Sequence, residues 1–287
     1  MGKLSRRDFL KTTITGVGAL SLGAILEACG KVLPEPTSST NTPFPSQEQP
    51  TVPSPSPTNT LPAAPEPSPT PTSTPLILPD LVVTRIGEPE DLVRRTITAL
   101  GGMQKFVPKG ANVIIKPNIC VDYRTYEYAA TTNPWVVGAL VKLCFETGAA
   151  SVKVMDNPFD GTQQQAYEMS GIKEQVEAAG GEMAYMLPYK YVQTSIPNAV
   201  VLKKTAIYDD IQKTDVLINV PIAKQHTSLA RLSMGMKNLM GAIQDRSALH
   251  INLVQCIADL NILIRPQLTV IDAVRILTTN GPTGGSL

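Results

Sequence analysis

The stretch N-V-I-I-K-P-N, residues 112–118, decides the fold of this chain. Three consecutive β-branched apolar residues, with no polar alternation, are typical of a strand that is covered on both faces. Such strands belong to parallel sheets with helices on either side. A polar turn of lysine, proline and asparagine follows at once. The stretch therefore predicts an α/β domain whose functional residues begin at the carboxyl end of a strand.

Strands and helices are expected to alternate along residues 80–287. Apolar runs predict strands over 81–86, 112–116, 151–155, 182–186, 215–220 and 268–271. Helices are expected over 89–100, 133–147, 162–169, 172–179 and 247–264, with a hairpin of strands 192–194 and 199–202. Proline at a first turn and glycine after the last turn mark the first two helices. This order predicts a mostly parallel sheet, helices on both faces and three layers.

Polar side chains follow four of these strands, and parallel strands place their carboxyl ends on one edge of a sheet. Catalytic roles are predicted for Lys116, Asp156 and His226. The predicted ligand-binding residues are Asn118, Asn157, Lys224, Lys237 and Asn238. Lysines suit an anionic group, His226 suits proton transfer or ligation, and the pair Asp156 and Asp272 suits a divalent metal ion. For each residue alone, the competing interpretation is a solvated turn.

The segment S-M-G-M-K-N-L-M-G, residues 233–241, predicts a helix that packs Met236 and Met240 on one face and brings Lys237 to the site. His226 and His250 are the two histidines of the chain, and a zinc site would require the fold to bring them together. Cys120 is either a reactive thiolate or a buried thiol, and Cys144 and Cys256 are expected to be buried.

The first 29 residues are expected to be an export signal. S-R-R-D-F-L-K, residues 5–11, resembles a twin-arginine signal, with Arg6 and Arg7 as its defining pair. An uncharged run over 12–26 follows, which is shorter than the ~20 residues that span a bilayer. L-E-A-C, ending at Cys29, resembles a lipobox and predicts lipidation there. A membrane-spanning anchor and simple secretion are the alternatives.

Residues 30–79 are expected to form a disordered stalk. Of the 25 prolines, 15 lie within residues 33–79, together with 16 serines and threonines. Such a segment buries too little apolar surface to offset the entropy of ordering it, and its prolines favour an extended chain. The chain is therefore predicted to present its domain on the outer face of a bacterial membrane, after passage through the twin-arginine export machinery.

Charge and cysteine content exclude several classes of protein. Residues 77–287 carry 20 lysines and arginines against 19 acids, so no basic stripe for nucleic acid is expected. Four cysteines without a C-x-x-C pair argue against a disulfide scaffold, a zinc ribbon and an iron–sulfur motif.

The domain resembles the family catalogued as domain of unknown function 362. The matching segments are I-I-K-P-N (114–118), T-N-P (132–134), V-M-D (154–156), N-V-P with K-Q-H (219–226), M-K-N-L-M-G (236–241), 266–272 and G-P (281–282). The resemblance implies no established activity. Some members carry an added iron–sulfur segment, and this chain has none. Related sequences continue past the glycine–proline loop, so we expect a C-terminally truncated domain.

Three functions remain open from the sequence. The first is an exported, lipid-anchored domain that binds an anionic small molecule, with or without a divalent metal, and acts on it. The second is a surface lipoprotein that binds a ligand without turnover. The third is a redox protein whose cofactor is inserted before export.

Overall fold

Strand β1 (Asn112–Pro117) lies at the centre of a five-stranded sheet with the order β3-β2-β1-β6-β9. This computed structural model describes residues 78–226 and 230–287. The predicted twin-arginine signal, Cys29 and residues 30–77 of the predicted stalk lie outside the described residues. The other strands are β2 (Ser151–Val154), β3 (Glu182–Met183), β6 (Val216–Val220) and β9 (Leu268–Thr269). Every pairing in this sheet is parallel, which confirms the predicted fold class.

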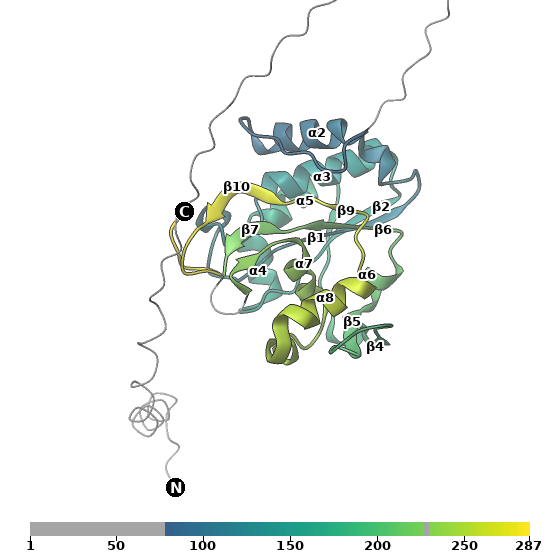
Figure 1. The fold of residues 1–287 in the computed structure, drawn as a ribbon. Helices are drawn as coiled ribbons and strands as arrows, with labels where there is room; N and C mark the ends of the chain where they lie inside the picture. The colour runs from purple at the N-terminus through teal and green to yellow at the C-terminus, as the bar shows by residue number, and fades with distance from the viewer. Residues whose placement is uncertain (1–77, 227–229) are drawn as a thin grey trace, which may run out of the picture. The chain divides into compact units, whose positions relative to one another are not determined.

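Helices cover both faces of the sheet (Figure 1). On one face, α2 (Pro89–Ala99), α3 (Pro134–Glu146) and α5 (Ile172–Ala178) pack over Val113 and Ile115. On the other, α8 (Leu253–Leu263) packs in a second core that contains Ile114 and Leu217. Successive side chains of β1 therefore enter different cores, and this is why its sequence is apolar without alternation.

A smaller three-stranded sheet, β10-β7-β8, lies beside the main sheet. Its strands are β7 (Ile222–Gln225), β8 (Leu232–Ser233) and β10 (Asp272–Leu277). The remaining helices and strands are α4 (Gln163–Met169), β4 (Tyr191–Ser195), β5 (Lys204–Tyr208), α6 (Asp209–Lys213) and α7 (Gly235–Asn238). β7 begins two residues after β6 ends, so the polar residues that follow β6 stay next to the end of β1.

Local signals place the helix ends close to where the sequence predicts them. The side chain of Asn133 accepts a hydrogen bond from the Trp135 N–H at 3.0 Å, and Pro134 occupies the first turn of α3. Thr162 caps α4 in the same way, through the Gln165 N–H at 3.2 Å. α2 stops before Gly101, whose φ of 105° is costly for residues with a Cβ. These caps orient the helices that flank the carboxyl end of β1.

The strand expected over residues 81–86 does not form. Leu81 and Val83 are 79% and 82% exposed, and no neighbouring strand pairs with them among the described residues. The segment 79–87 instead lines one side of a groove of about 860 Å³, with residues 267–274 on the other side. The sequence has a strand-like composition here, but the edge strand β9 is only two residues long and pairs with β6 alone.

The helix expected over residues 247–264 is broken. Ser247–Asn252 forms a 3-10 helix, and α8 begins only at Leu253. Asn252 has φ −145° and ψ 68°, outside the helical region, which separates the two segments. Leu249 and Leu253 are buried on either side of the break, so both segments still contribute to the same core.

A hairpin is present and its first strand is the expected one, but the second strand predicted over 199–202 does not form. β4 pairs antiparallel with β5, and β5 begins at Lys204 rather than at residue 199. Residues 200–202 do not join the hairpin. Their backbone N–H groups donate instead to the buried carboxylate of Asp259 on α8. This long-range contact overrides the local tendency to form a strand.

The methionine face expected over residues 233–241 is not formed. α7 ends at Asn238 and a 3-10 turn, Leu239–Ala242, continues the chain. The change in helical period leaves Met236 51% exposed while Met240 is buried. No helix in the described part of the chain is long and apolar enough to cross a bilayer.

Candidate functional site

A cavity of about 290 Å³ lies at the carboxyl ends of β1 and β2, bounded by β7 and α7. All eight residues predicted to be catalytic or ligand-binding line it: Lys116, Asn118, Asp156, Asn157, Lys224, His226, Lys237 and Asn238. The strand-end pattern therefore brings distant parts of the chain to one place. Their individual roles depend on how they contact one another.

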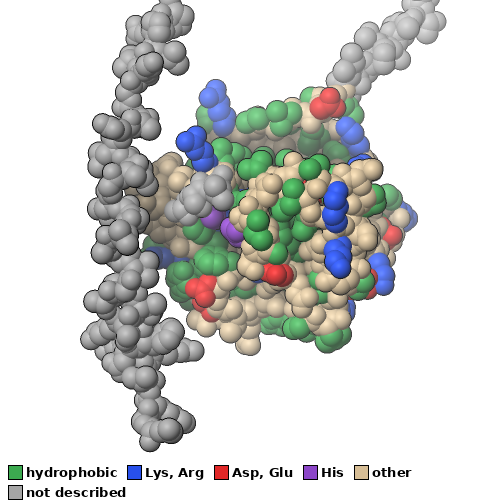
Figure 2. Space-filling model, turned by 60° about the horizontal axis from the view of Figure 1, so that its bottom comes forward, with side chains coloured by type: hydrophobic (Ala, Val, Ile, Leu, Met, Phe, Trp, Pro, Cys, Tyr) green, Lys and Arg blue, Asp and Glu red, His purple; other side chains and the backbone are tan. Residues whose placement is uncertain are grey.

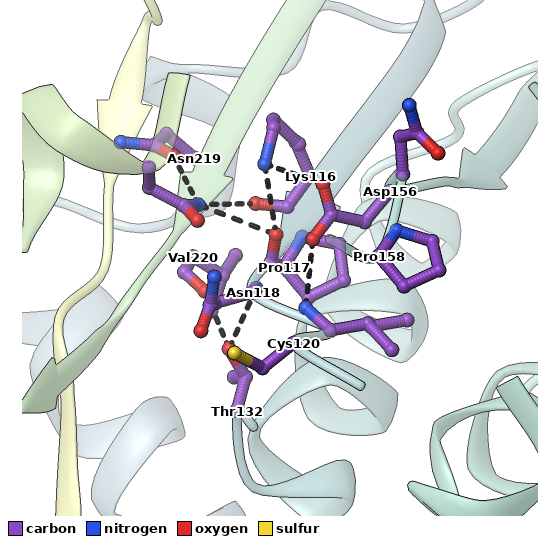
Figure 3. A network of polar contacts seen from close by, with 12 residues as sticks. Lys116, Pro117, Asn118, Cys120, Thr132, Asp156, Pro158, Asn219 and Val220 are labelled. Carbon is purple, nitrogen blue, oxygen red and sulfur yellow. Dashed lines mark hydrogen bonds and ion pairs between the residues drawn. The ribbon is translucent and has the colours of Figure 1, made fainter. Parts of the chain in front are cut away.

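The floor of the cavity is a buried ion pair. Lys116 Nζ lies 2.7 Å from Asp156 Oδ1, and the two side chains are 0% and 2% exposed. Asp156 Oδ2 accepts the Ile119 N–H at 2.7 Å, and Lys116 Nζ also donates to the Pro117 carbonyl at 3.1 Å (Figure 3). Burial lowers the pKa of Lys116, while the charge and hydrogen bond of Asp156 act in the opposite direction.

Gly241 packs directly against this pair. A Cβ at Gly241 would overlap Asp156 Oδ1 and would lie 2.7 Å from Lys116 Nζ. Only a residue without a side chain lets the 3-10 turn of residues 239–242 cover the two charges so closely.

Two asparagines join the ends of β1 and β6. Asn238 Nδ2 donates to Asn219 Oδ1 at 2.8 Å and to the carbonyls of Lys116 and Pro117 at 3.3 Å each. Asn219 Nδ2 in turn donates to the Gly235 carbonyl at 2.9 Å. The Nδ2 group of Asn238 is therefore a structural bridge, whereas its Oδ1 is buried without a hydrogen-bond partner and stays available to a ligand in the cavity.

Thr132 fixes the turn that follows β1. Its hydroxyl accepts the Asn118 N–H at 2.9 Å and donates to the Val220 carbonyl at 2.8 Å (Figure 3). The Thr132 N–H donates to the Asn118 carbonyl at 2.9 Å. These three bonds hold the polar turn in place, and Asn118 reaches the cavity wall from it.

Three further cations line the cavity. Lys224 is buried and donates to the Ala130 carbonyl at 2.6 Å, and Arg246 donates to the Pro158 carbonyl at 3.0 Å. Burial, and then the charge of Lys224, lower the pKa of Lys237 to about 8. Asp156 is the one carboxylate in the lining, and it is already bonded to Lys116, so these cations give the cavity a positive potential.

Both histidines of the chain line the cavity, His226 from the region just after β7 and His250 from the 3-10 helix before α8. His250 Nδ1 contacts the Arg246 carbonyl at 3.0 Å. The fold therefore brings together the two residues whose meeting the sequence left open. Among the residues that the structure describes, however, no group of three or more His, Cys, Asp and Glu side chains is arranged to hold a metal ion.

Asp272 does not join the predicted site. It is 3% exposed, and its carboxylate accepts the backbone N–H groups of Asn133 at 2.7 Å and Val274 at 3.0 Å. Burial raises the pKa of Asp272, against the effect of these two hydrogen bonds. Asp272 lines the groove beside residues 79–87, whereas Asp156 lines the cavity, so the structure does not pair them around a metal.

The three cysteines in the described residues, Cys120, Cys144 and Cys256, are free and buried. Cys120 lines the cavity, and its thiol lies close enough to Lys237 to influence that amine. Burial raises the pKa of Cys144 to about 12 and also raises that of Cys256, which suits the expected role of buried thiols.

Arg246 and Phe159 are cavity residues that the sequence did not indicate. Phe159 follows the predicted turn after β2, and Arg246 lies in a loop without a recognisable motif. The hydrogen bond from Arg246 to the Pro158 carbonyl brings these two segments together. Arg246 and Pro158 are 88 positions apart, so their contact depends on the tertiary fold and no local sequence signal predicts it.

Comparison with known proteins identifies a curated relative and several similar solved chains. The thylakoid-associated protein sll1697 of Synechocystis sp. is 27% identical over 203 residues, which cover 67% of this chain and 61% of that protein. This chain therefore matches less than two thirds of the relative's length. The lactate racemase apoprotein from Thermoanaerobacterium thermosaccharolyticum has a TM-score of 0.38 and 18% identity, and the match covers 54% of this chain and 37% of that one.

A family model matches residues 113–287, which comprise the sheet from β1 onwards and every residue that lines the cavity. The segments that carry the resemblance in the sequence therefore fall within the matched region. The chain belongs to the family described as Domain of unknown function (DUF362).

Proposed function

We propose that the domain binds an anionic small molecule in the cavity at the carboxyl ends of β1 and β2. The observation that carries this proposal is the charge balance of the lining, where Lys116, Lys224, Lys237 and Arg246 accompany the single carboxylate of Asp156. Because Lys116 and Asp156 neutralise each other, the remaining three cations have no carboxylate in the lining. A concave, partly desolvated site with this excess of positive charge favours phosphate, sulfate or carboxylate groups.

Lys237 and Arg246 are the principal anion-binding groups in this proposal. Lys224 uses one ammonium hydrogen for the Ala130 carbonyl and retains two further donors. Asn157 is oriented by its contact with the Tyr191 hydroxyl at 3.4 Å. His226 is the proposed proton-transfer residue, because it lines the cavity and histidine is the side chain that most often acts as a general acid or base. Lys116 and Asp156 support the floor on which the ligand rests.

Isothermal titration calorimetry with inorganic phosphate and with sulfate tests this proposal on the full chain. We expect Lys237→Gln and Arg246→Gln each to weaken binding by roughly 10- to 100-fold, since a hydrogen bond to a charged group contributes about 1.5–3 kcal/mol. Lys204→Gln is the matched control, because Lys204 is exposed on β5 and does not line the cavity. The proposal fails if the unmodified chain binds neither anion, or if the control variant weakens binding equally.

The proposal also places the domain outside the cytoplasm, anchored by a lipid on Cys29 after export through the twin-arginine machinery. Its support is the sequence of residues 5–29. The relative from Synechocystis is named for its association with thylakoids, which are membranes. We expect Arg6→Lys combined with Arg7→Lys to retain the protein in the cytoplasm, and Cys29→Ser to release it from membranes. Cell fractionation distinguishes these outcomes from a spanning anchor, which would survive the Cys29 change.

A further inference from the structure

The cavity wall is apolar between its cations. Ile119, Phe159, Met240 and Pro282 line the same space as the three unneutralised cations. A small, strongly hydrated anion gains nothing from such a wall, because it exchanges water for hydrocarbon there. A ligand that fills this cavity well therefore has an apolar part next to its charged group.

The opening of the cavity is also apolar. Phe159 lines the cavity and is nevertheless 57% exposed, so its ring lies at the mouth. His250 also lines the cavity from an exposed position, and Ile251 and Val254, which follow it, are 90% and 71% exposed. Figure 2 shows the histidine side chains in a hollow, with hydrophobic side chains beside them.

The core does not explain why Ile251 and Val254 are apolar. Leu249 and Leu253, on the same two helical segments, are 0% and 4% exposed and provide the contacts with the core. Ile251 directly follows the cavity residue His250, and exposed large apolar residues of this kind are typical of a surface that contacts a ligand or partner.

Arg246 joins the two sides of the mouth. Its hydrogen bond to the Pro158 carbonyl, at 3.0 Å, brings Phe159 next to the segment that carries His250 and Ile251. The acids nearby accept backbone hydrogen bonds: Asp160 Oδ1 from the Gly161 N–H, Asp245 Oδ1 from the Ser247 N–H, and Asp122 Oδ2 from the Thr162 N–H. The mouth thus joins a cationic interior to an apolar exterior.

We infer that the ligand is an amphiphilic anion, a hydrocarbon chain that ends in a phosphate, as in a membrane lipid. Its phosphate binds Lys237 and Arg246 inside the cavity, and its chain passes Phe159 and lies over Ile251 and Val254. This inference rests on the proposed anion binding and adds the chemical class of the ligand. A free phosphate uses only the interior, whereas a lipid phosphate uses both the interior and the mouth.

Calorimetry with ethyl, butyl and octyl phosphate, each below its aggregation concentration, tests the inference on the full chain. Each methylene that the mouth buries should tighten binding roughly threefold to fourfold, the fold-change for its transfer from water. Ile251→Ser combined with Val254→Ser should remove much of the gain for octyl phosphate and leave ethyl phosphate unchanged. Val83→Ser is the control, since Val83 is 82% exposed and lines the separate groove.

The outcomes separate the two proposals. Equal affinities for ethyl and octyl phosphate would overturn the lipid inference and leave anion binding intact. Failure of every phosphate, inorganic phosphate included, would overturn both. If octyl phosphate binds Lys237→Gln and Arg246→Gln as tightly as it binds the unmodified chain, it adsorbs without using the cavity, and the inference is wrong. Circular dichroism of the Ile251→Ser and Val254→Ser variant checks that its fold is unchanged.

Discussion

Lys116 and Asp156, 40 residues apart in the sequence, form a buried ion pair with 2.7 Å between Nζ and Oδ1. They reach each other because β1 and β2 are adjacent and parallel, so that the last residue positions of both strands meet at one edge. The pair supplies the cavity with a neutral floor and leaves its positive charge to the walls. Its energetics and its consequences for the ligand can both be measured.

Asp156→Asn should destabilise the fold by about 3–5 kcal/mol, because it leaves the ammonium of Lys116 buried without a counter-charge. Urea unfolding near neutral pH measures this loss. The matched control is Glu182→Gln, which removes the partner of Lys153 from a surface pair 3.5 Å apart, with side chains 40% and 60% exposed. That change should cost less than about 1 kcal/mol. Equal losses for the two variants would contradict the structural role of the buried pair.

Raising the pH should partly rescue Asp156→Asn. In this variant burial and the charge of Arg246 both act to lower the pKa of Lys116, and no carboxylate opposes them, so its folded-state pKa lies well below the ordinary lysine value of about 10.4. Between those two values the unfolded chain binds more protons than the folded one, and stability rises with pH. The difference in the free energy of unfolding between the variant and the unmodified chain should therefore decrease from about pH 7 to about pH 9.5. Adding Lys116→Met to the variant should abolish this dependence.

Gly241→Ala should destabilise the fold by about 1–3 kcal/mol, since the new methyl group overlaps Asp156 and forces the turn away from the ion pair. Thermal unfolding provides the measurement. Gly284→Ala is the control, because a Cβ at Gly284 meets nothing within 4 Å. An unchanged melting temperature for Gly241→Ala would mean that the turn moves freely over the ion pair.

Sulfate binding should weaken as the pH rises through about 8, the pKa to which burial and Lys224 lower Lys237. Sulfate keeps its charge over this range, so the loss reports on the protein. Calorimetry at a series of pH values should show the decline in the unmodified chain and a flatter profile in Lys237→Gln. Cys120→Ser should retain the decline, which separates the amine from the neighbouring thiol. A decline that persists in Lys237→Gln would assign the titration to another group.

Asp259→Asn should destabilise the loop of residues 200–202 and cost about 1–3 kcal/mol. Burial alone would raise the pKa of Asp259, but the three backbone N–H groups outweigh it and hold the pKa well below its usual range. For a carboxylate with a lowered pKa, the contribution to stability is present above about pH 4 and is lost as the pH falls further. Urea unfolding at neutral and acidic pH should show that loss, and the Asn variant should lack it. Gln255→Ala, which removes one side-chain donor to Asp259, is the milder comparison.

The sequence predicts most of the main sheet because burial on both faces leaves a clear mark on it. The apolar run of β1 is an example, and the cap-and-proline signal of Asn133 and Pro134 likewise marks the start of α3. The strand expected at 81–86 and the single helix at 247–264 are wrong, since strand pairing and the break at Asn252 depend on tertiary contacts. Short strands such as β8 carry too few residues to show a period.

The location of the cavity follows from strand ends, but the roles of its residues do not. Nothing in the sequence indicates that Lys116 pairs with Asp156 rather than with a ligand, or that Asn238 bridges β1 and β6. Arg246 lies in a loop that its hydrogen bond to the Pro158 carbonyl holds at the cavity. Asp272, in contrast, accepts the Asn133 N–H at the start of α3 and does not line the cavity. The sequence pattern predicts which strand or helix each residue belongs to. Hydrogen bonds between distant strands and helices decide which side-chain groups remain available to bind a ligand.

The contact between Asp272 and the Asn133 N–H spans 139 residues of sequence. It joins the start of α3 to β10, so it cannot form until the ribosome has synthesised the chain as far as Asp272. The sheet likewise lacks its edge strand β9 until residues 268–269 have emerged. Both contacts therefore form late in the synthesis of residues 112–272. The export that we propose suits such a chain when the domain crosses the membrane in its folded state, whereas a route that threads the chain outward during its synthesis would leave this folding step to the far side of the membrane.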